Sequence, residues 1–266
     1  MPRADRKQYR APALEKGLDV LELLAQSSRP RSTIEIGADL GRSRSEIFRM
    51  LSVLEDRGYI RRDGTEEGFG LTTKLFELAM QSPPTVNLLG ASLPVMESLA
   101  EATSQSCHLA VASRDEMVVV ARVESPDEVG FAVKIGHRRS LVDSTSGRVL
   151  LAFQPDARRD AWLRKVRKHH RFSVDMLRRD LARIQRQGHC RTRSTYVEGV
   201  TDLACPVFDG ESSGAVAALS IPYVSRRSAR RSVSDVMTRL RTAADEIGSV
   251  LQVRASSRPQ APGEKS

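Results

Sequence analysis

Cysteine and long apolar runs are scarce in this sequence. Cys107, Cys190 and Cys205 are its three cysteines; they are odd in number, widely spaced and form no CxxC pair. This usage argues against a disulfide framework or a zinc site and favours a reducing compartment. No apolar run approaches the ~18 residues of a transmembrane helix, and the basic N-terminus lacks the apolar stretch of a signal peptide. We therefore expect a cytoplasmic protein without a membrane partner, a bound metal or a cofactor.

Motifs of catalysis are missing as well. The sequence has no nucleophile elbow, phosphate loop or paired-carboxylate motif. Cys107 and His108 are neighbours in a strand-like segment, so their side chains should point to opposite faces and are badly placed as a thiol and its base. We expect that the protein is not an enzyme. An acyl hydrolase is kept as an alternative.

Positive charge is plentiful but unevenly placed. The formal net charge is +9 and the pI is about 9.9, which favours a polyanionic partner. Residues 1–80 nevertheless hold 14 Lys and Arg against 13 Asp and Glu. The largest basic excess lies in residues 158–193, with 13 Lys and Arg against 3 Asp and Glu. The sequence suggests no role for that stretch.

The segment "SRSEIFRMLSVLEDRGYI", which begins at Ser43, has the pattern of an amphipathic helix. Its apolar residues recur at steps of three and four and should face a core; they are Ile47, Met50, Leu51 and Leu54. Ser43 and Glu46 have the spacing of a capping box, and Gly58 can end the helix. The opposite face is basic, carries hydroxyls and one aromatic ring, and comprises Arg44, Ser45, Phe48, Arg49 and Ser52. Alone, it is an ordinary solvated face.

The neighbouring segments change that interpretation. Leucines at 14, 18, 21 and 24 mark a first helix, and a second runs from the Ser32–Glu35 capping box to Gly41. Residues 59–72 read as a β-hairpin around Asp63 and Gly64. Three helices and a hairpin make a winged helix-turn-helix, whose last helix enters the DNA major groove. The expected DNA-binding residues are Thr33, Ser43, Arg44, Ser45, Phe48, Arg49, Arg61 and Arg62, the last two on phosphates. A winged-helix module for RNA or protein is the alternative.

The rest of the chain predicts an α+β domain around an antiparallel sheet. A short helix over 71–81 is stopped by "SPPT", and another helix runs from Val86. Strand-like segments cover 107–113, 117–124, 131–135, 203–209 and 215–221, with helical patterns at 146–153, 157–169, 173–188 and 233–251. The expected organisation is a basic flexible arm (1–12), a DNA-binding domain (13–72), a linker helix (73–85), a second domain (86–253) and a flexible tail (254–266). The arm either follows the minor groove or is merely a soluble tail.

The order of these parts resembles the IclR family of bacterial transcription regulators over roughly residues 13–253. The resemblance rests on "ALEKGLDVLELL", "SEIFRMLSVLEDRGYI", a wing ending in "FGLT", "STSGRVLLAF" and "EGVTDLACPVFD…AVAALSI". It implies a winged helix-turn-helix, a linker helix and a GAF-like effector domain. It also implies homodimers or tetramers that bind short palindromic operators, repress or activate transcription, and respond to small metabolites, often organic acids.

A ligand site is expected where "VDSTSGRVLLAF" begins a helix. Free N–H groups, the helix dipole and three hydroxyls make that helix start a natural anion site, although simple N-capping would also explain one hydroxyl. The resemblance adds positions on later strands, so the expected effector-binding residues are Ser144, Thr145, Ser146, Thr192, Asp202 and Ser220. A carboxylate at Asp202 favours a hydroxylated ligand such as a hydroxy acid or sugar acid. The alternative places Asp202 on the surface.

Overall fold

The computed structural model spans the 266-residue chain and describes residues 11–63, 68–128, 130–166, 173–225 and 231–256. The chain divides after Val86 into two compact units. Nearly all of the predicted N-terminal arm and most of the predicted tail lie outside the described residues, as does Gly64 of the predicted hairpin tip.

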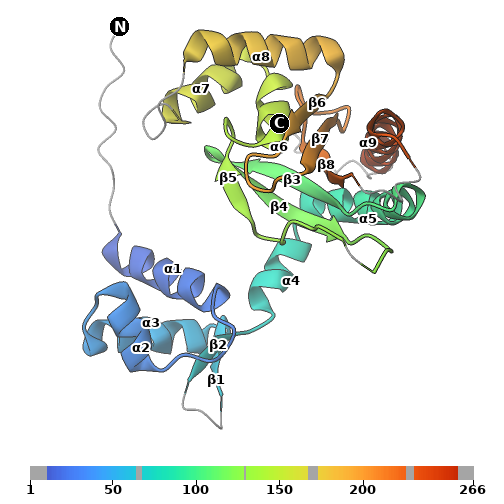
Figure 1. The fold of residues 1–266 in the computed structure, drawn as a ribbon. Coiled ribbons are helices and arrows are strands. Elements are labelled where there is room, and N and C mark those ends of the chain that lie inside the picture. Colours follow the sequence, from blue (N-terminus) through green and yellow to red (C-terminus); the bar gives the residue numbers. More distant parts are fainter. Residues whose placement is uncertain (1–10, 64–67, 129, 167–172, 226–230, 257–266) are drawn as a thin grey trace, which may run out of the picture. The chain divides into compact units, whose positions relative to one another are not determined.

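The first unit contains three helices and a two-stranded hairpin (Figure 1). These elements are α1 (Pro12–Ala25), α2 (Thr33–Leu40), α3 (Arg44–Asp56), β1 (Ile60–Arg62) and β2 (Phe69–Leu71). The strands are antiparallel, with Ile60 opposite Leu71. Both predicted capping boxes form, Ser32 with Glu35 and Ser43 with Glu46. Each box supplies partners to N–H groups that the first turn leaves free, which fixes where the helix begins. The winged helix-turn-helix fold is thereby confirmed.

The apolar face of α1 differs from the prediction. Leu14 and Leu18 are 63% and 49% exposed, whereas Val20 and Leu24 are buried. The reason is that only the C-terminal half of α1 reaches the core formed with Ile36, Ile47, Leu51, Ile60 and Phe69. The leucine spacing was therefore a correct sign of a helix; Leu21 and Leu24 pack in or against the core, whereas Leu14 and Leu18 do not.

The segment after the hairpin forms two helices, α4 (Lys74–Met80) and α5 (Pro83–Thr103). The "SPPT" segment does end α4 as predicted, but its prolines also begin α5, three residues before the predicted start at Val86. Proline suits the first turn of a helix because no partner exists there for its missing N–H. No residue of α4 is buried.

The second unit is built on a six-stranded antiparallel sheet in the order β5-β4-β3-β8-β7-β6. Its strands are β3 (Cys107–Ser113), β4 (Glu116–Val123), β5 (Arg138–Ser140), β6 (Cys190–Arg193), β7 (Val200–Val207) and β8 (Ala217–Val224). Helices α6 (Thr145–Ala152), α7 (Asp156–Val166) and α8 (Val174–Gln187) follow β5, and α9 (Val233–Ser256) follows β8. The α+β prediction is correct.

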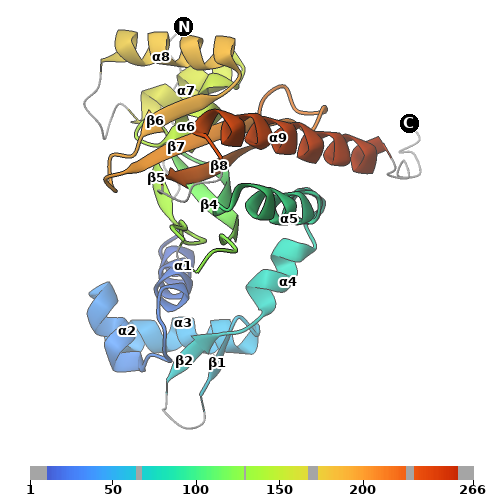
Figure 2. The same ribbon diagram turned by 45° about the vertical axis from the view of Figure 1, so that its right-hand side comes forward.

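Helices cover both faces of this sheet (Figure 2). Helices α5 and α9 pack on one face, where Leu109, Leu203 and Leu219 belong to their core. Helices α6, α7 and α8 pack on the other face against smaller side chains such as Ala110, Ala204 and Ala218. Along β3, β7 and β8 the large residues of the first face alternate with small or polar residues on the second, which therefore has room for a cavity. No helix in the described parts of the chain is both long and apolar enough to cross a bilayer.

Two strand assignments need correction. Residues 131–135 were predicted as a strand but have no ladder partner. The edge strand beside β4 is instead β5, where Arg139 lies opposite Met117. Conversely, β6 was not predicted, because the alternating arginines of "CRTR" give no apolar pattern. The predicted helices that end at Phe153 and Gly188 match α6 and α8, and Gly188 adopts a φ of 73°.

Candidate functional sites

The first candidate site is the exposed face of α3. Arg44, Ser45, Phe48, Arg49 and Ser52 are all exposed, as predicted. Phe48 keeps 55% of its surface accessible, an unusual position for a phenyl ring that has no ligand to contact. Arg44 and Arg49 have no ion-pair partner among the described residues. The face thus presents free guanidinium groups and hydroxyls, the groups that read base edges and phosphates.

The carboxylate beside this face, that of Glu46, already has hydrogen-bond partners within the protein. Glu46 accepts from Lys16 Nζ at 2.5 Å and from Ser43 Oγ at 2.8 Å. These two hydrogen bonds, that from Lys16 first, lower the pKa of Glu46 to about 2. The Ser43 hydroxyl is therefore already used in capping α3. Thr33, the first residue of α2, is half-buried. Both can still offer a hydroxyl near the start of a helix.

The two arginines of the hairpin differ. Arg61 is exposed, and no carboxylate pairs with it in the part of the chain that the structure describes. Arg62 lies over the Phe69 ring, 5.1 Å from its centroid, and its Nε lies 3.4 Å from Glu55 Oε1. Arg61 is therefore free to meet a phosphate, whereas Arg62 also ties the hairpin to α3.

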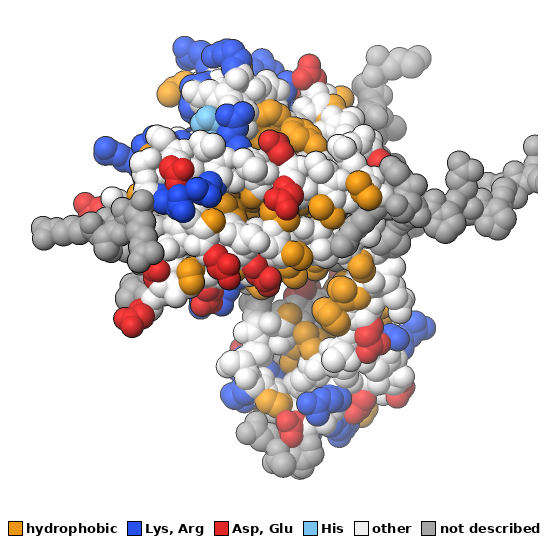
Figure 3. All heavy atoms as spheres, turned by 90° about the vertical axis from the view of Figure 1, so that its right-hand side faces the viewer, with side chains coloured by type: hydrophobic (Ala, Val, Ile, Leu, Met, Phe, Trp, Pro, Cys, Tyr) orange, Lys and Arg blue, Asp and Glu red, His pale blue; other side chains and the backbone are white. Residues whose placement is uncertain are grey.

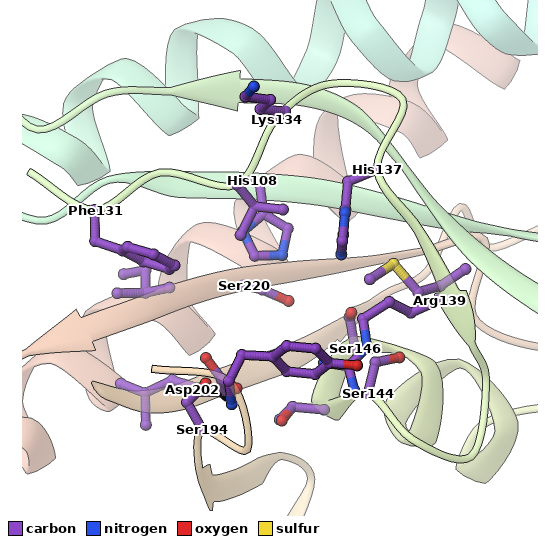
Figure 4. Close-up of a pocket in the computed structure, with 16 residues that line it drawn as sticks. His108, Phe131, Lys134, His137, Arg139, Ser144, Ser146, Ser194, Asp202 and Ser220 are labelled. Atoms are coloured by element: carbon purple, nitrogen blue, oxygen red, sulfur yellow. Dashed lines mark hydrogen bonds between the residues drawn. The ribbon is translucent and has the colours of Figure 1, made fainter. Parts of the chain in front are cut away.

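The second candidate site is a cavity of about 270 Å³ in the second unit (Figure 4). It lies on the sheet face that α6 covers. Five of the six predicted effector residues line it, namely Ser144, Thr145, Ser146, Asp202 and Ser220. They come from the start of α6, from β7 and from β8, more than seventy positions apart in the chain. The alternative that Asp202 lies on the open surface is wrong, because its side chain faces this cavity.

Thr192 is the sixth predicted residue, and it does not line the cavity. Its hydroxyl lies 2.6 Å from the Thr145 hydroxyl, and in the sheet it is the register partner of Asp202. It therefore lies beside two lining residues, Thr145 and Asp202, at the edge of the site.

The three hydroxyl groups at the start of α6 differ in their hydrogen-bond partners. Ser144 caps the helix, because its Oγ accepts from the Gly147 amide at 3.1 Å. Thr145 is held by Thr192, whereas Ser146 has no side-chain partner among the described residues. The N-capping alternative is thus correct for Ser144. The amides of Thr145 and Ser146, the first two of the helix, have no acceptor within it, so the Ser146 hydroxyl and these two amides are available to an anion.

Two buried polar atoms face the cavity without a partner. His108 and Ser220 are directly opposite each other on β3 and β8, and their side chains point toward the cavity (Figure 4). They are 7% and 4% exposed, and neither His108 Nδ1 nor Ser220 Oγ has a hydrogen-bond partner within the described residues. A buried polar group without a partner costs about 1–3 kcal/mol. Such a pair therefore indicates a place for a polar ligand or water.

The charged lining groups are of both signs. Burial raises the pKa of Asp202, while the Arg139 charge and a hydrogen bond from Ser194 oppose that shift. Burial also lowers the pKa of His108 to about 4, with a smaller contribution from His137, so His108 is neutral at pH 7. Arg139 lies 3.7 Å from the centroid of the Tyr196 ring. Lys134 also borders the cavity, but Figure 4 shows its amino group directed away from the other lining side chains.

Several lining residues were not predicted: His108, Met117, Phe131, Val133, Lys134, His137, Arg139, Ser194, Tyr196, Leu203 and Ile221. A signal existed for His108. The alternation that places Cys107 in the core also places His108 on the opposite face, and a histidine there is unusual. Residues 131–137 contribute four lining side chains from a segment without regular structure, for which no periodic pattern exists.

Known proteins match both units of the chain. The family described as "IclR helix-turn-helix domain" matches residues 13–64, and "Bacterial transcriptional regulator IclR C-terminal" matches residues 81–249. The HTH-type transcriptional regulator KdgR of Escherichia coli is 27% identical over 248 residues, which are 91% of this chain and 94% of that protein. The Pca operon regulatory protein of Acinetobacter baylyi is 27% identical over 250 residues, covering 90% and 88%.

A crystal structure of an IclR homologue from Microbacterium hydrocarbonoxydans, complexed with 4-hydroxybenzoate, has the same fold. It superposes with a TM-score of 0.76 at 24% identity and covers 91% of this chain and 99% of its own. The fold, the order of the elements and both family matches agree. The chain therefore belongs to the IclR family of bacterial transcription regulators.

Proposed function

We propose that this regulator reads operator DNA with α3 and that a small hydroxylated carboxylate, such as a hydroxy acid or sugar acid, controls it from the cavity. The observation that carries the ligand proposal is the pair His108 Nδ1 and Ser220 Oγ. Both atoms are buried, adjacent and without a partner among the described residues. A ligand hydroxyl can donate to the neutral imidazole and accept from the serine at once.

The remaining cavity groups suit the two ends of such a ligand. A carboxylate is favoured near Arg139 and by the amides at the start of α6. Asp202 disfavours a second anionic group, and it accepts hydrogen bonds from hydroxyls. Phe131, Val133 and Met117 add an apolar wall that fits carbon atoms. A volume of about 270 Å³ limits the ligand to a small metabolite.

The enzyme alternative has little support in the chemistry of the thiols. Burial raises the pKa of Cys107 and of Cys205 to about 12. Cys107 Sγ also donates to the Met96 carbonyl on the core side of the sheet. Nucleophilic catalysis needs a thiolate within reach of a base, which neither position offers. We propose a sensor without turnover that acts in the cytoplasm, where bacterial DNA is found.

A two-fold assembly is the second part of the proposal. Helix α4 has four exposed apolar residues and no buried one: Leu75, Phe76, Leu78 and Met80. Leu14 and Leu18 of α1 are exposed in the same unit. Apolar surface of this extent is typical of an interface between subunits. Pairing would also double the length of DNA that the protein reads.

Three probe compounds test the ligand proposal. Gluconate has both hydroxyls and a carboxylate, glucose has hydroxyls but no carboxylate, and hexanoate has a carboxylate but no hydroxyls. Titration calorimetry should show binding of gluconate-like acids and weaker binding of the other two. The active acid should change operator affinity, and operator DNA should change acid affinity by the same factor, because the coupling is reciprocal. A screen of hydroxy acids and sugar acids in which none binds would overturn the proposal.

The variant Asp202→Asn sharpens this test, because it removes a charge from the cavity while keeping the shape. It should change the ranking of ligands and leave ligand-free operator binding intact. Asp245→Asn is the matched control, since Asp245 is exposed on α9 outside the cavity. If both variants keep the wild-type ranking, Asp202 has no part in recognition.

A further inference from the structure

The basic excess of the chain lies neither on the DNA-reading helix nor in the cavity. Residues 158–193 carry 13 Lys and Arg against 3 Asp and Glu, so the other 230 residues together have a net charge of −1. The described part of this stretch forms α7, α8 and β6. Figure 3 shows Lys and Arg side chains gathered at the top of the second unit, where Figure 1 places α8.

Helix α8 separates its core side sharply from its charged side. Leu177, Leu181 and Ile184 are buried at steps of four and three. At 100° per residue, Arg179 and Arg186 lie on the opposite side, facing solvent. Their Cα atoms are about 10 Å apart along the axis, at 1.5 Å per residue. Arg178, also exposed, widens the same side.

Most of these charges are not neutralised by the protein. Arg178 and Arg186 have no carboxylate partner among the described residues, and Arg179 donates only to the Asp175 carbonyl. The other acid of the helix, Asp180, is already paired with Arg148 and Arg183. On the edge strand β6, Arg191 and Arg193 are exposed and likewise lack an acidic partner within the described ranges. They alternate with Cys190 and Thr192, so they project at the sheet edge on the face opposite α8. We call the solvent side of α8, with Arg178, Arg179 and Arg186, and the edge strand that follows it, with Arg191 and Arg193, the α8–β6 surface.

The composition of the α8–β6 surface decides between partners. A specific protein partner needs buried apolar or aromatic anchors, and the only large apolar side chain exposed on α8 is Met176. Separate, unpaired guanidinium groups on a regular helix instead match a line of phosphates. This protein belongs to a family that binds DNA, so duplex DNA is the polyanion it meets.

We infer that the α8–β6 surface binds the phosphate backbone of duplex DNA, outside the base pairs that α3 reads. The inference rests on the DNA-binding role of the chain and is independent of the ligand in the cavity. Such binding adds affinity without sequence preference and makes it strongly dependent on salt. The bound segment is either the flank of the operator duplex or a second duplex.

The test uses the full-length protein with Arg178→Gln, Arg179→Gln and Arg186→Gln combined. The matched control combines Arg122→Gln, Arg138→Gln and Arg239→Gln, which removes the same charge from residues that are ion-paired elsewhere in the unit. The dissociation constant for a random 60-base-pair duplex is measured against KCl concentration. Removing one arginine from a DNA phosphate should lower the log–log slope by about 0.9, so the slope should fall by about 2–3 in the triple variant only.

Two further arms separate the sources of the phosphates. If the surface binds operator flanks, wild-type affinity should rise with flank length and the triple variant should not respond. If it binds a second duplex, two differently labelled duplexes should show energy transfer only with the wild type. Arg191→Gln with Arg193→Gln provides an independent variant should the triple variant fail to fold.

The proposal is overturned if the triple variant and the control have equal slopes. It is equally overturned if the variant changes only the oligomeric state by sedimentation, or only the binding to phosphatidylglycerol vesicles. A simultaneous loss of binding by the isolated operator core would indicate damage to α3, a failure distinct from that of the α8–β6 surface.

Discussion

The hydroxyl oxygens of Thr145 and Thr192 lie 2.6 Å apart, which joins the first residue of α6 to the edge strand β6. One of them lines the cavity and the other does not. The hydrogen bond thus fixes the position of a cavity wall from outside the cavity.

Thr192→Val should weaken ligand binding although Thr192 does not line the cavity. The substitution keeps the shape, removes the hydroxyl and leaves Thr145 without its partner, which is a loss of about 0.5–1.5 kcal/mol. We expect a fall in ligand affinity of about twofold to tenfold by calorimetry, with operator binding unchanged. In a double-mutant cycle with Thr145→Val the two effects should be strongly non-additive.

Thr201→Val is the control for that cycle, because Thr201 lies on the neighbouring strand opposite Arg193 rather than at α6. Additive effects of Thr145→Val and Thr192→Val would mean that the bond between their hydroxyls has no role in shaping the site.

His108 should make the stability of the second unit sensitive to acid. Burial lowers its pKa to about 4 in the folded chain, whereas an unfolded histidine titrates near 6.5. Between these values the unfolded state binds more protons, so stability is complete above about pH 6.5 and falls as the pH drops toward 4. The loss should be on the order of 3 kcal/mol, at 1.36 kcal/mol per pKa unit.

Chemical denaturation of wild type and His108→Asn at several pH values measures this effect. The difference between the two curves isolates His108 from other acid-titrating groups such as Asp202. His189→Asn, which removes a histidine outside the cavity, is the matched control. Parallel curves for wild type and His108→Asn would contradict the assignment of a neutral buried imidazole.

On α3, Arg44→Ala and Arg49→Ala should each lower operator affinity. A base-reading arginine contributes about 1–3 kcal/mol, and its loss relaxes specificity at one base pair. Arg57→Ala is the control, because it removes an equal charge from the C-terminal end of the same helix. Unchanged operator affinity in both α3 variants would show that this face does not read DNA.

The hairpin offers a contrast within one experiment. Arg61→Ala should weaken binding to all sequences and lower the salt slope by about 1. Arg62→Ala should in addition destabilise the first unit, because Arg62 packs on Phe69 and pairs with Glu55.

Sedimentation should reveal self-association at micromolar concentration, with and without DNA. Leu75→Ser combined with Leu78→Ser should weaken it at least tenfold, since burying each leucine is worth about 1.5–3 kcal/mol. The fold should survive, because neither residue is buried within the chain. Ile135→Ser, another exposed apolar position, should not affect association. A wild-type monomer under all conditions would contradict the paired assembly.

The sequence predicted well whatever depends on local chemistry. The capping boxes at Ser32 and Ser43 set the starts of α2 and α3, and a positive φ at Gly188 set the end of α8. These are short-range effects of single side chains on nearby backbone groups, so spacing alone is enough to find them. The buried face of α3 followed from periodicity for the same reason.

Features that depend on distant partners were harder to predict. Leucine spacing in α1 could not show that Leu14 lies beyond the reach of the core. Phe131 and Val133 alternate like a strand because they face a cavity, although no neighbouring strand pairs with them. The site residues were found through chemistry at one helix start and through family resemblance, whereas Lys134 and Arg139 reach the cavity only because the chain folds back over the sheet.

Gly147 follows directly after the three cavity-lining residues at the start of α6 and leaves no room for a side chain. A side chain there would put its Cβ 2.5 Å from both the Leu141 carbonyl oxygen and Ser144 Oγ, closer than such atoms approach in proteins. The side chain of the neighbouring Ser146 lines the cavity itself. To use this protein as a biosensor for other ligands, one would randomise the residues at the start of α6. Functional variants from such a library should carry various residues at position 146 but only glycine at position 147.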